Sequence, residues 1–367
     1  MRIAIDATAI GSGRGGDHTY LSGVVAGLGR VADRHDHHYD LYLRSDTDWQ
    51  PPPGPFSVQP LRPAGSARLV SSLPLAWSRS THDVHLSYTH MPVPTTGPTA
   101  LVVTDLSFVH HPESYPRSAR VRLNAIVPRQ ARRAAAVVTL SDFCRRDLIE
   151  AYQLDADRVH VVPCAIAEPD PDPGRELDGW ARSEGIVGPF VLYLGNLHPR
   201  KNVARLVEAM ASLPEVRQGD LQLVVAGGHW WGGGGEDVAA RAAPPGSVVR
   251  LGVISDAQRE YLLRRAEVLA YPSLFEGFGL PPLEAMARDT PVVVADRAAL
   301  PEVVGDAAVR VDPMCPAAIA DGVQRVLGDD ALRADLVAAG RSRVAEYSVA
   351  RSGEAAVTAL EAAAGHR

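Results

Sequence analysis

Short apolar runs alternate with helix-like patterns along the whole chain. In the first half, the apolar runs predict strands at Ile3–Ile5, Tyr39–Leu43, Val84–Ser87, Ala100–Val103, Val137–Leu140 and Val159–Val162. Between these runs, the spacing of apolar residues favours helices over Thr19–Leu28 and Phe143–Tyr152. Strands that are apolar throughout and alternate with helices are typical of a parallel sheet covered on both faces.

A proline-rich stretch interrupts this rhythm in the middle of the chain. Pro163–Gly174 carries four prolines among acidic residues, so it suits neither a helix nor a strand and predicts a linker. After it, strands are predicted at Phe190–Leu194, Leu221–Ala226, Val248–Leu251, Val268–Ala270, Val292–Ala295 and Ala308–Val311, with helices at Val203–Ala211, Asp256–Arg265 and Leu283–Ala287.

These patterns predict an α/β fold with two doubly wound, Rossmann-like domains, residues 1–168 and 169–347. Ligands of such sheets bind at the carboxyl ends of the strands, so the cleft between the domains is the expected site.

A glycine-rich turn follows the first predicted strand. It reads G-S-G-R-G-G-D-H-T-Y (Gly11–Tyr20), and Gly15 and Gly16 would let backbone N–H groups approach an anionic ligand at the start of the next helix. No acidic residue ends a strand about 20 residues later, so the turn does not match the dinucleotide fingerprint. A flexible glycine loop without a ligand is the alternative.

A second turn, G-N-L-H-P-R-K-N (Gly195–Asn202), follows the strand Phe190–Leu194. Arg200 and Lys201 fall at the expected start of the next helix, where positive side chains oppose the helix dipole. The pattern therefore predicts a bound anion such as a diphosphate, and a solvated basic turn is the alternative. Lys201 is the only lysine among the 37 basic residues of the chain, which favours a specific role for it.

Two glutamates stand in the segment Y-P-S-L-F-E-G-F-G-L-P-P-L-E-A-M-A (Tyr271–Ala287). Glu276 comes at the carboxyl end of a predicted strand, beside unhindered backbone N–H groups of glycine. Glu284, after seven intervening residues, falls at the start of a helix expected near Pro282. A carboxylate in such a position suits the hydroxyl groups of a sugar, and the second suits a ribose. The alternative is that both carboxylates only cap local structure.

Composition narrows the class of protein. Acidic residues (43) outnumber basic ones (37), giving a formal net charge of −6, which disfavours a nucleic-acid partner. The three cysteines have no metal-ligand spacing, and their odd number argues against a disulfide framework. The chain starts directly with a strand pattern and has no run of 18 apolar residues, so a soluble cytoplasmic protein is expected.

Three weaker signals have a simple structural alternative. The run H-D-H-H (His35–His38) offers metal ligands, but no second ligand cluster accompanies it in the sequence, so an exposed turn is favoured. Trp230 and Trp231 stand in a glycine-rich segment after a strand and would either stack on a sugar or base or simply pack. A group of arginines would either touch an anionic membrane or form a solvated helix face: Arg117, Arg120, Arg122, Arg129, Arg132 and Arg133.

Four segments together resemble a known family. E-G-F-G-L-P-P-L-E looks like the E-x7-E motif of retaining glycosyltransferases of family 4, which have the GT-B fold, and G-N-L-H-P-R-K-N looks like their diphosphate loop. The turn with Gly15, Gly16 and Tyr20 resembles the glycine loop of their first domain. Val138–Leu148 resembles another of their segments. The two C-terminal motifs are the more specific ones, and the resemblance covers nearly the whole chain.

The resemblance implies roles for the residues of the second domain. Lys201 would contact the donor diphosphate, Glu276 would hold the donor sugar, and Glu284 would bond the ribose. Ile254 and Asp256 would lie near the base. The remaining donor-binding positions are Gly15, Gly16, Gly195, Asn196, Asn202, Gly277, Phe278, Gly279 and Leu280.

Two departures from the family pattern concern the catalytic set. Asn196 stands where many relatives have an arginine, and Arg200 is the expected replacement. Thr104-Asp105-Leu106 stands where many relatives have His-Asp-Leu. Asp105 is retained as a catalytic position with Glu276, Lys201 and Arg200. Thr104 and two nearby histidines would serve the acceptor instead of the missing histidine: His110 and His111.

The function implied is that of a retaining glycosyltransferase. It would move a sugar from a nucleotide-diphosphate donor, GDP-mannose or a UDP-sugar, to a hydroxyl of a glycan, lipid-linked or small natural-product acceptor. No Asp-x-Asp stands at a strand end, so neither a metal nor another cofactor is expected. By the same resemblance the first domain would bind the acceptor, and a last helix, about 348–367, would return to complete it. The alternatives are a catalytically impaired sugar-nucleotide-binding protein and, less well supported, an epimerase of the same fold.

Overall fold

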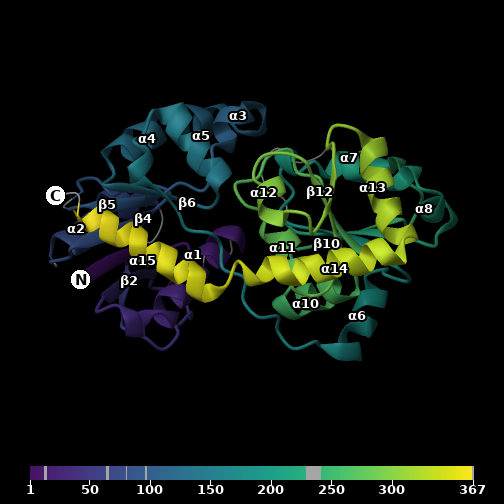
Figure 1. The fold of residues 1–367 in the computed structure, drawn as a ribbon, viewed down its shortest axis with the longest axis horizontal. Coiled ribbons are helices and arrows are strands. Elements are labelled where there is room, and N and C mark those ends of the chain that lie inside the picture. Colours follow the sequence, from purple (N-terminus) through teal and green to yellow (C-terminus); the bar gives the residue numbers. More distant parts are fainter. Residues whose placement is uncertain (12–14, 63–65, 80, 96, 229–240, 366–367) are drawn as a thin grey trace. The chain divides into compact units, whose positions relative to one another are not determined.

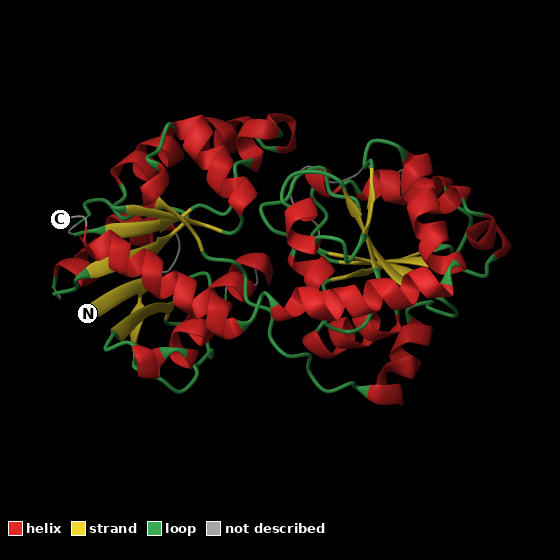
Figure 2. Cartoon of the chain, in the orientation of Figure 1, coloured by secondary structure: helices red, strands yellow, loops and turns green. Residues whose placement is uncertain are grey.

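Contacts divide the chain into two compact units, and the computed structural model describes residues 1–11, 15–62, 66–79, 81–95, 97–228 and 241–365. Unit 1 contains Met1–Leu106, Val121–Ala167 and Tyr347–Arg367, and unit 2 contains Ser107–Arg120 and Glu168–Glu346. Each unit has one parallel sheet with helices packed around it (Figure 1, Figure 2). The predicted α/β fold of two doubly wound domains is confirmed.

The sheet of unit 1 has seven parallel strands in the order β3-β2-β1-β4-β5-β6-β7. They are β1 (Arg2–Asp6), β2 (His38–Arg44), β3 (Phe56–Leu61), β4 (Val84–Tyr88), β5 (Thr99–Val102), β6 (Ala136–Thr139) and β7 (Val159–Val161). Its helices are α1 (Gly15–Arg30), α2 (Ser72–Ser78), α5 (Asp142–Tyr152), α15 (Val349–Gly365) and most of α4 (Arg117–Arg133).

The sheet of unit 2 has six parallel strands in the order β10-β9-β8-β11-β12-β13. They are β8 (Phe190–Leu194), β9 (Gln222–Ala226), β10 (Val248–Gly252), β11 (Val268–Tyr271), β12 (Val292–Ala295) and β13 (Val309–Val311). The helices are α3 (Ser107–His110), α6 (Asp178–Ser183), α7 (Val203–Ser212), α8 (Pro214–Gln218), α10 (Asp256–Arg265), α11 (Leu280–Met286), α12 (Leu300–Val304), α13 (Pro316–Gly328) and α14 (Asp330–Ala345).

Every apolar run predicted as a strand is a strand in the structure, within one or two residues. Most of these strands are buried along their length, as expected when helices cover both faces of a parallel sheet. The edge strands β7 and β10 have half-buried or exposed residues as well. The sequence did not predict β3. That strand has mostly half-buried or exposed side chains and contains Pro60, which is tolerated because β3 lies at the edge of the sheet.

The last helix, α15, belongs to unit 1 and packs against α1, as the yellow and purple helices of Figure 1 show. Backbone meets backbone at this contact, because a Cβ on Gly353 would lie 2.2 Å from the carbonyl oxygen of Gly27. The helix is also fixed to the end of β7, where the Ser352 hydroxyl donates to the Pro163 carbonyl at 2.8 Å. It therefore forms part of the core of unit 1.

Residues 107–120 group with unit 2, although the sequence boundary at residue 168 places them in the first domain. Aromatic contacts account for this. The His110 ring stacks on Phe275 with centroids 5.2 Å apart, and the Tyr115 ring lies 5.4 Å from His198. Contacts of this kind join residues far apart in sequence, so a linear reading does not detect them.

The arginine-rich segment forms α4, which contains Pro128. Val127 and Ala131 are its buried residues, so the arginines surround a narrow apolar stripe. Among the residues that the structure describes, no helix has both the length and the apolar character needed to cross a bilayer. A peripheral contact of α4 with an anionic membrane stays a prediction.

Candidate active site

The topology of unit 2 indicates where a ligand would bind. Strand order reverses between β8 and β11, which are adjacent, and the register pairs Val191 with Val268 and Leu192 with Leu269. In open parallel sheets, ligands bind outside the carboxyl ends of the strands at such a reversal. The two loops that leave this point contain the basic turn and the first glutamate singled out in the sequence.

The loop after β8 is held in shape by its own backbone. Gly195 has a φ of +147°, and the Tyr193 hydroxyl donates to the Asn196 carbonyl at 3.1 Å. Arg200 and Lys201 lie in a single 3₁₀ turn, η6 (Pro199–Lys201), and α7 begins only at Val203. The predicted helix start at Val203 is confirmed, and both cations lie in the short turn before it, which the left-handed conformation of Asn202 separates from α7.

Asn202 joins the two loops. Its side-chain amide donates to the carbonyls of Pro272 (3.0 Å) and Pro313 (2.7 Å), and its oxygen accepts from Arg205 at 2.8 Å. The backbone N–H of Leu274 donates to the Arg200 carbonyl at 2.7 Å. These contacts fix the basic turn against the glutamate loop and indicate that Asn202 positions the site.

Lys201 and Glu276 form a buried ion pair. The Lys201 Nζ lies 2.6 Å from Glu276 Oε1, and the two side chains are 8% and 7% exposed. The sequence predicted a bound anion as the charge that compensates Lys201, and it gave no sign of a compensating charge within the protein. Glu276, 75 residues away in sequence, supplies the compensating charge inside the fold.

Arg200 contacts the same carboxylate from the other side. Its Nη1 lies 3.2 Å from Glu276 Oε2 and donates to the Phe275 carbonyl at 2.7 Å. Burial alone would raise the pKa of Glu276, but the charges of Lys201 and Arg200, with the hydrogen bond from Lys201, lower it to about 2. Glu276 is therefore ionised at neutral pH, and these three side chains together keep a net charge of +1.

Tyr271, which the sequence analysis did not single out, completes this group. Its hydroxyl accepts from Lys201 Nζ at 2.7 Å, and its ring stacks on Tyr193 with centroids 5.9 Å apart. Burial, with the negative charge of Glu276, raises the pKa of Tyr271 well above its ordinary value, so the phenol stays protonated. The only signal in the sequence was a tyrosine ending an apolar strand.

Glu284 has a different partner, Arg259 of α10, with which it forms a charge-assisted hydrogen bond. Burial alone would lower the pKa of Arg259, but the charge of Glu284 raises it. Gly279, with a φ of +111°, precedes α11, which begins at Leu280. Glu284 is thus the fifth residue of α11, and the expectation of a helix start near Pro282 is wrong by two residues.

The other predicted donor positions of unit 2 lie in the segments that follow β8, β10 and β11. Gly277, Phe278 and Leu280 continue the loop that carries Glu276, and Phe278 is buried. Ile254 is half-buried and Asp256 is exposed at the start of α10, where Ser255 caps the helix. Trp230 and Trp231 lie outside the described residues.

The predicted positions of the first domain are divided between the units. Gly15 and Gly16 start α1 of unit 1, and both are exposed. Thr104 and Asp105 follow β5 in unit 1, where the Thr104 carbonyl accepts from the Cys144 thiol.

The two histidines proposed for the acceptor lie in unit 2. His110 stacks on Phe275, and the ring centroid of His111 lies 5.7 Å from that of Phe275. The structure thus brings both histidines next to the residue that precedes Glu276.

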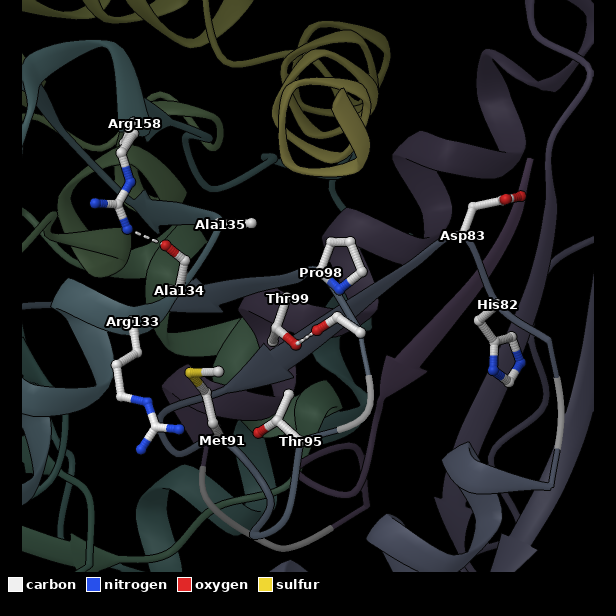
Figure 3. Close-up of a pocket in the computed structure, with 11 residues that line it drawn as sticks. His82, Asp83, Met91, Thr95, Pro98, Thr99, Arg133, Ala134, Ala135 and Arg158 are labelled. Carbon is white, nitrogen blue, oxygen red and sulfur yellow. Dashed lines mark hydrogen bonds between the residues drawn. The ribbon is translucent and has the colours of Figure 1, made fainter. Parts of the chain in front are cut away.

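Unit 1 contains a cavity of about 720 Å³ beside the amino ends of several strands of its sheet (Figure 3). Its walls include His82 and Asp83 before β4, Thr99 at the start of β5, and Arg133 and Arg158. These are the amino ends of the strands, whereas ligands of doubly wound sheets bind at the carboxyl ends. The cavity shares no residue with the Lys201–Glu276 pair.

The patterns of two families match the chain, one in each half. The pattern of the family described as "Glycosyl transferases group 1" matches residues 182–343, and that described as "Glycosyltransferase Family 4" matches residues 23–168. Between them they cover most of the chain.

Curated relatives match part of the chain. The O-antigen chain mannosyltransferase B of Escherichia coli is 31% identical over 248 residues, which are 66% of this chain and 65% of that protein. The phosphatidyl-myo-inositol mannosyltransferase of Mycobacterium tuberculosis is 34% identical over 218 residues, 57% of this chain and 55% of that protein. The chain thus spans less than two thirds of the length of these relatives.

Solved structures match over nearly the whole chain and show the fold. Sucrose-phosphate synthase of Thermosynechococcus elongatus has a TM-score of 0.75 at 19% identity, with 98% of each chain covered. The Anabaena protein HepE, in complex with UDP-glucose, has a TM-score of 0.70 at 17% identity, with 98% of this chain and 99% of that chain covered.

Proposed function

The chain belongs to the family 4, group 1 glycosyltransferases, and on that premise we propose that it transfers a sugar from a nucleotide-diphosphate donor to a hydroxyl group with retention of configuration. The observation that carries the proposal is the cluster of Lys201, Arg200 and Glu276 at the strand-order reversal of unit 2. One net positive charge stands there beside a carboxylate that is fixed in its ionised form. A leaving diphosphate and a sugar ring that becomes positive need charges of these two signs.

In this proposal the cations act on the leaving group. Lys201 and Arg200 stabilise the negative charge that develops on the diphosphate as the bond to the sugar breaks. The low pKa of Glu276 excludes it as a general acid at neutral pH, so it orients the sugar hydroxyls and faces the positive charge of the ring. The acceptor hydroxyl attacks the face of the sugar from which the diphosphate departs, and the departing phosphate accepts the proton of that hydroxyl.

The mannosyltransferase relatives favour GDP-mannose as the first donor to test, with UDP-sugars next. Purified protein would be incubated with each donor, with and without simple glycosides as acceptors, and release of nucleoside diphosphate would be measured. We expect one donor to bind and turn over. Binding without turnover of any donor would support the catalytically impaired alternative, and the absence of any nucleotide binding would contradict both. A cytoplasmic location is part of the proposal, in keeping with three free cysteines.

Transfer is expected to survive treatment with EDTA. Glu276 and Glu284, the two carboxylates of the site, are each engaged by cations, so neither is placed to bridge a metal ion to the diphosphate. The measurement is the initial rate before and after chelation, at a temperature well below unfolding. A strict requirement for added magnesium or manganese would contradict the prediction.

Glu284→Gln is expected to raise the donor KM about 10- to 100-fold with kcat little changed. The residue is assigned to the ribose, a contact that is equal in the ground and transition states. Loss of a hydrogen bond to a charged group costs about 1.5–3 kcal/mol, which gives that range. Affinity for the bare nucleoside diphosphate, measured by calorimetry, should fall by the same factor.

The matched control is Glu208→Gln, an exposed glutamate on α7 of the same unit. It should leave both KM and nucleotide affinity unchanged. If Glu284→Gln behaves like this control, Glu284 serves only to hold Arg259.

A further inference from the structure

Two histidines and a glutamate meet in unit 1, whereas the candidate active site lies in unit 2. His35 and His37 precede β2, and Glu361 lies near the end of α15. Glu361 Oε1 lies 2.9 Å from His37 Nε2 and 4.0 Å from His35 Nδ1. One ligand atom from each of the three residues lies within 4.8 Å of the others. The sequence alone showed no second group of metal ligands near the histidines. The third ligand comes from α15, more than 300 residues further along the chain.

Partners on the outside hold these side chains in place. His35 Nε2 lies 3.2 Å from a carboxylate oxygen of Glu354, which stands about two turns before Glu361 on the same face of α15. Glu354 also pairs with Arg34. The His37 side chain is 10% exposed, and its Nδ1 lies 3.3 Å from the Met1 nitrogen. The rings of His35 and His37 stack, with centroids 5.6 Å apart. Both imidazoles are thus oriented before any ligand arrives.

We propose that His35, His37 and Glu361 bind one zinc ion and that the ion fastens α15 to the segment before β2. Two imidazole nitrogens and one carboxylate oxygen are ligands that zinc accepts, with a water molecule in the fourth position. Ligand atoms about 2.0–2.1 Å from a tetrahedral zinc lie roughly 3.3 Å from one another. The distances of 2.9 and 4.0 Å reach this spacing after small side-chain rotations.

Glu354 fits the place of a supporting residue for this site. A histidine that binds a metal through one ring nitrogen usually donates its other N–H to a carboxylate, which fixes the tautomer. Glu354 does this at His35 Nε2 and leaves Nδ1 to face Glu361. Zinc would take the place of the His37–Glu361 hydrogen bond.

The expected effect is on the stability of unit 1. The ion would join two segments of unit 1 that lie more than 300 residues apart in the sequence. Because the ion binds the folded unit and not the open chain, zinc should raise the unfolding temperature in a concentration-dependent way. It should not change sugar transfer directly, since the site contains no residue of the Lys201–Glu276 cluster.

The test is calorimetric titration of the EDTA-treated full chain with zinc chloride. We expect one zinc ion per chain, visible absorption bands of a four-coordinate site when cobalt(II) replaces zinc, and a rise in unfolding temperature. Glu361→Gln and His37→Asn should lose this binding, and Glu354→Gln should weaken it about 10- to 100-fold. The control is His38→Asn, because His38 turns to the Ser57 hydroxyl instead and should leave zinc affinity unchanged.

Two results would overturn the proposal. One is the absence of stoichiometric zinc binding by the unaltered chain, in which case the cluster is a latch of histidine–glutamate hydrogen bonds. The other is equal loss of binding in His38→Asn and Glu361→Gln, which would mean that zinc binds surface histidines without selection. Glu361→Gln changes a half-exposed residue, so it should fold even if His37→Asn does not.

Discussion

Glu276→Gln is expected to lower sugar transfer by about 100-fold or more while affinity for the nucleoside diphosphate stays constant or increases. Transfer falls because the ionised carboxylate that faces the reacting sugar is lost. Nucleotide affinity does not fall, because Lys201 and Arg200 lose the negative charge that partly neutralises them. Initial rates and calorimetry with the bare nucleoside diphosphate give the two numbers.

Lys201→Met should lower both quantities, since it removes the cation assigned to the diphosphate. The opposite signs of the two variants in nucleotide affinity identify which charge acts on which part of the donor. A fall in nucleotide affinity in Glu276→Gln as large as in Lys201→Met would contradict the assignment. It would mean that the ion pair serves only to keep the loops in place.

Glu276→Gln should destabilise unit 2 by about 3–5 kcal/mol, because it leaves the buried Lys201 without an anionic partner. Lys201→Met should destabilise it less, because Glu276 keeps Arg200. The double variant Lys201→Met/Glu276→Gln should be more stable than the sum of the two single changes predicts. Urea unfolding measures all three. The control pair is Arg341 with Asp289, which is exposed to solvent, and its removal should barely change stability.

Gly227→Ala is expected to destabilise unit 2 by about 3 kcal/mol or more. Gly227 has a φ of +149°, and a Cβ there would lie 1.8 Å from the carbonyl oxygen of Gly195. The Gly195–Asn196 peptide would have to move, and this peptide begins the loop that carries Arg200 and Lys201. Donor affinity should therefore fall together with stability, as measured by calorimetry and urea unfolding.

Gly246→Ala separates the two causes. Gly246 has a φ of +76°, but nothing lies within 4 Å of the position of its Cβ, so the substitution adds backbone strain without a clash. We expect a loss of about 1–2 kcal/mol and unchanged donor affinity. Equal effects at the two glycines would contradict the argument that the approach of Gly227 to Gly195 shapes the site.

Much of the fold could be predicted from the sequence, because a buried strand of a parallel sheet consists of a continuous run of apolar residues. The runs ending at Leu194 and Tyr271 mark the two strand ends at which the site forms. The edge strand β3 has no such run, since its side chains meet solvent and it includes Pro60. Strands could therefore be predicted where their side chains are apolar, and β3, which has mostly half-buried or exposed side chains, was missed.

The candidate site could be predicted only in part. Residue types and glycine turns located the loops that carry Lys201 and Glu276, but gave no sign that the two side chains bind each other. The partners Arg259 and Tyr271 were missed for the same reason, since each stands in an ordinary helix or strand. Pairings across 25 to 75 residues are decided by strand order, which the sequence alone did not provide.

The return of α15 to unit 1 has a consequence for synthesis on the ribosome. Unit 1 begins at Met1 but takes its last helix from Tyr347–Arg367, so all of Glu168–Glu346 is made in between. At about 5–20 residues per second, the 179 residues from Glu168 to Glu346 take roughly 9–36 s. During that time the face of α1 around Gly27 has no α15 to cover it, and it is exposed to chaperones and to neighbouring nascent chains.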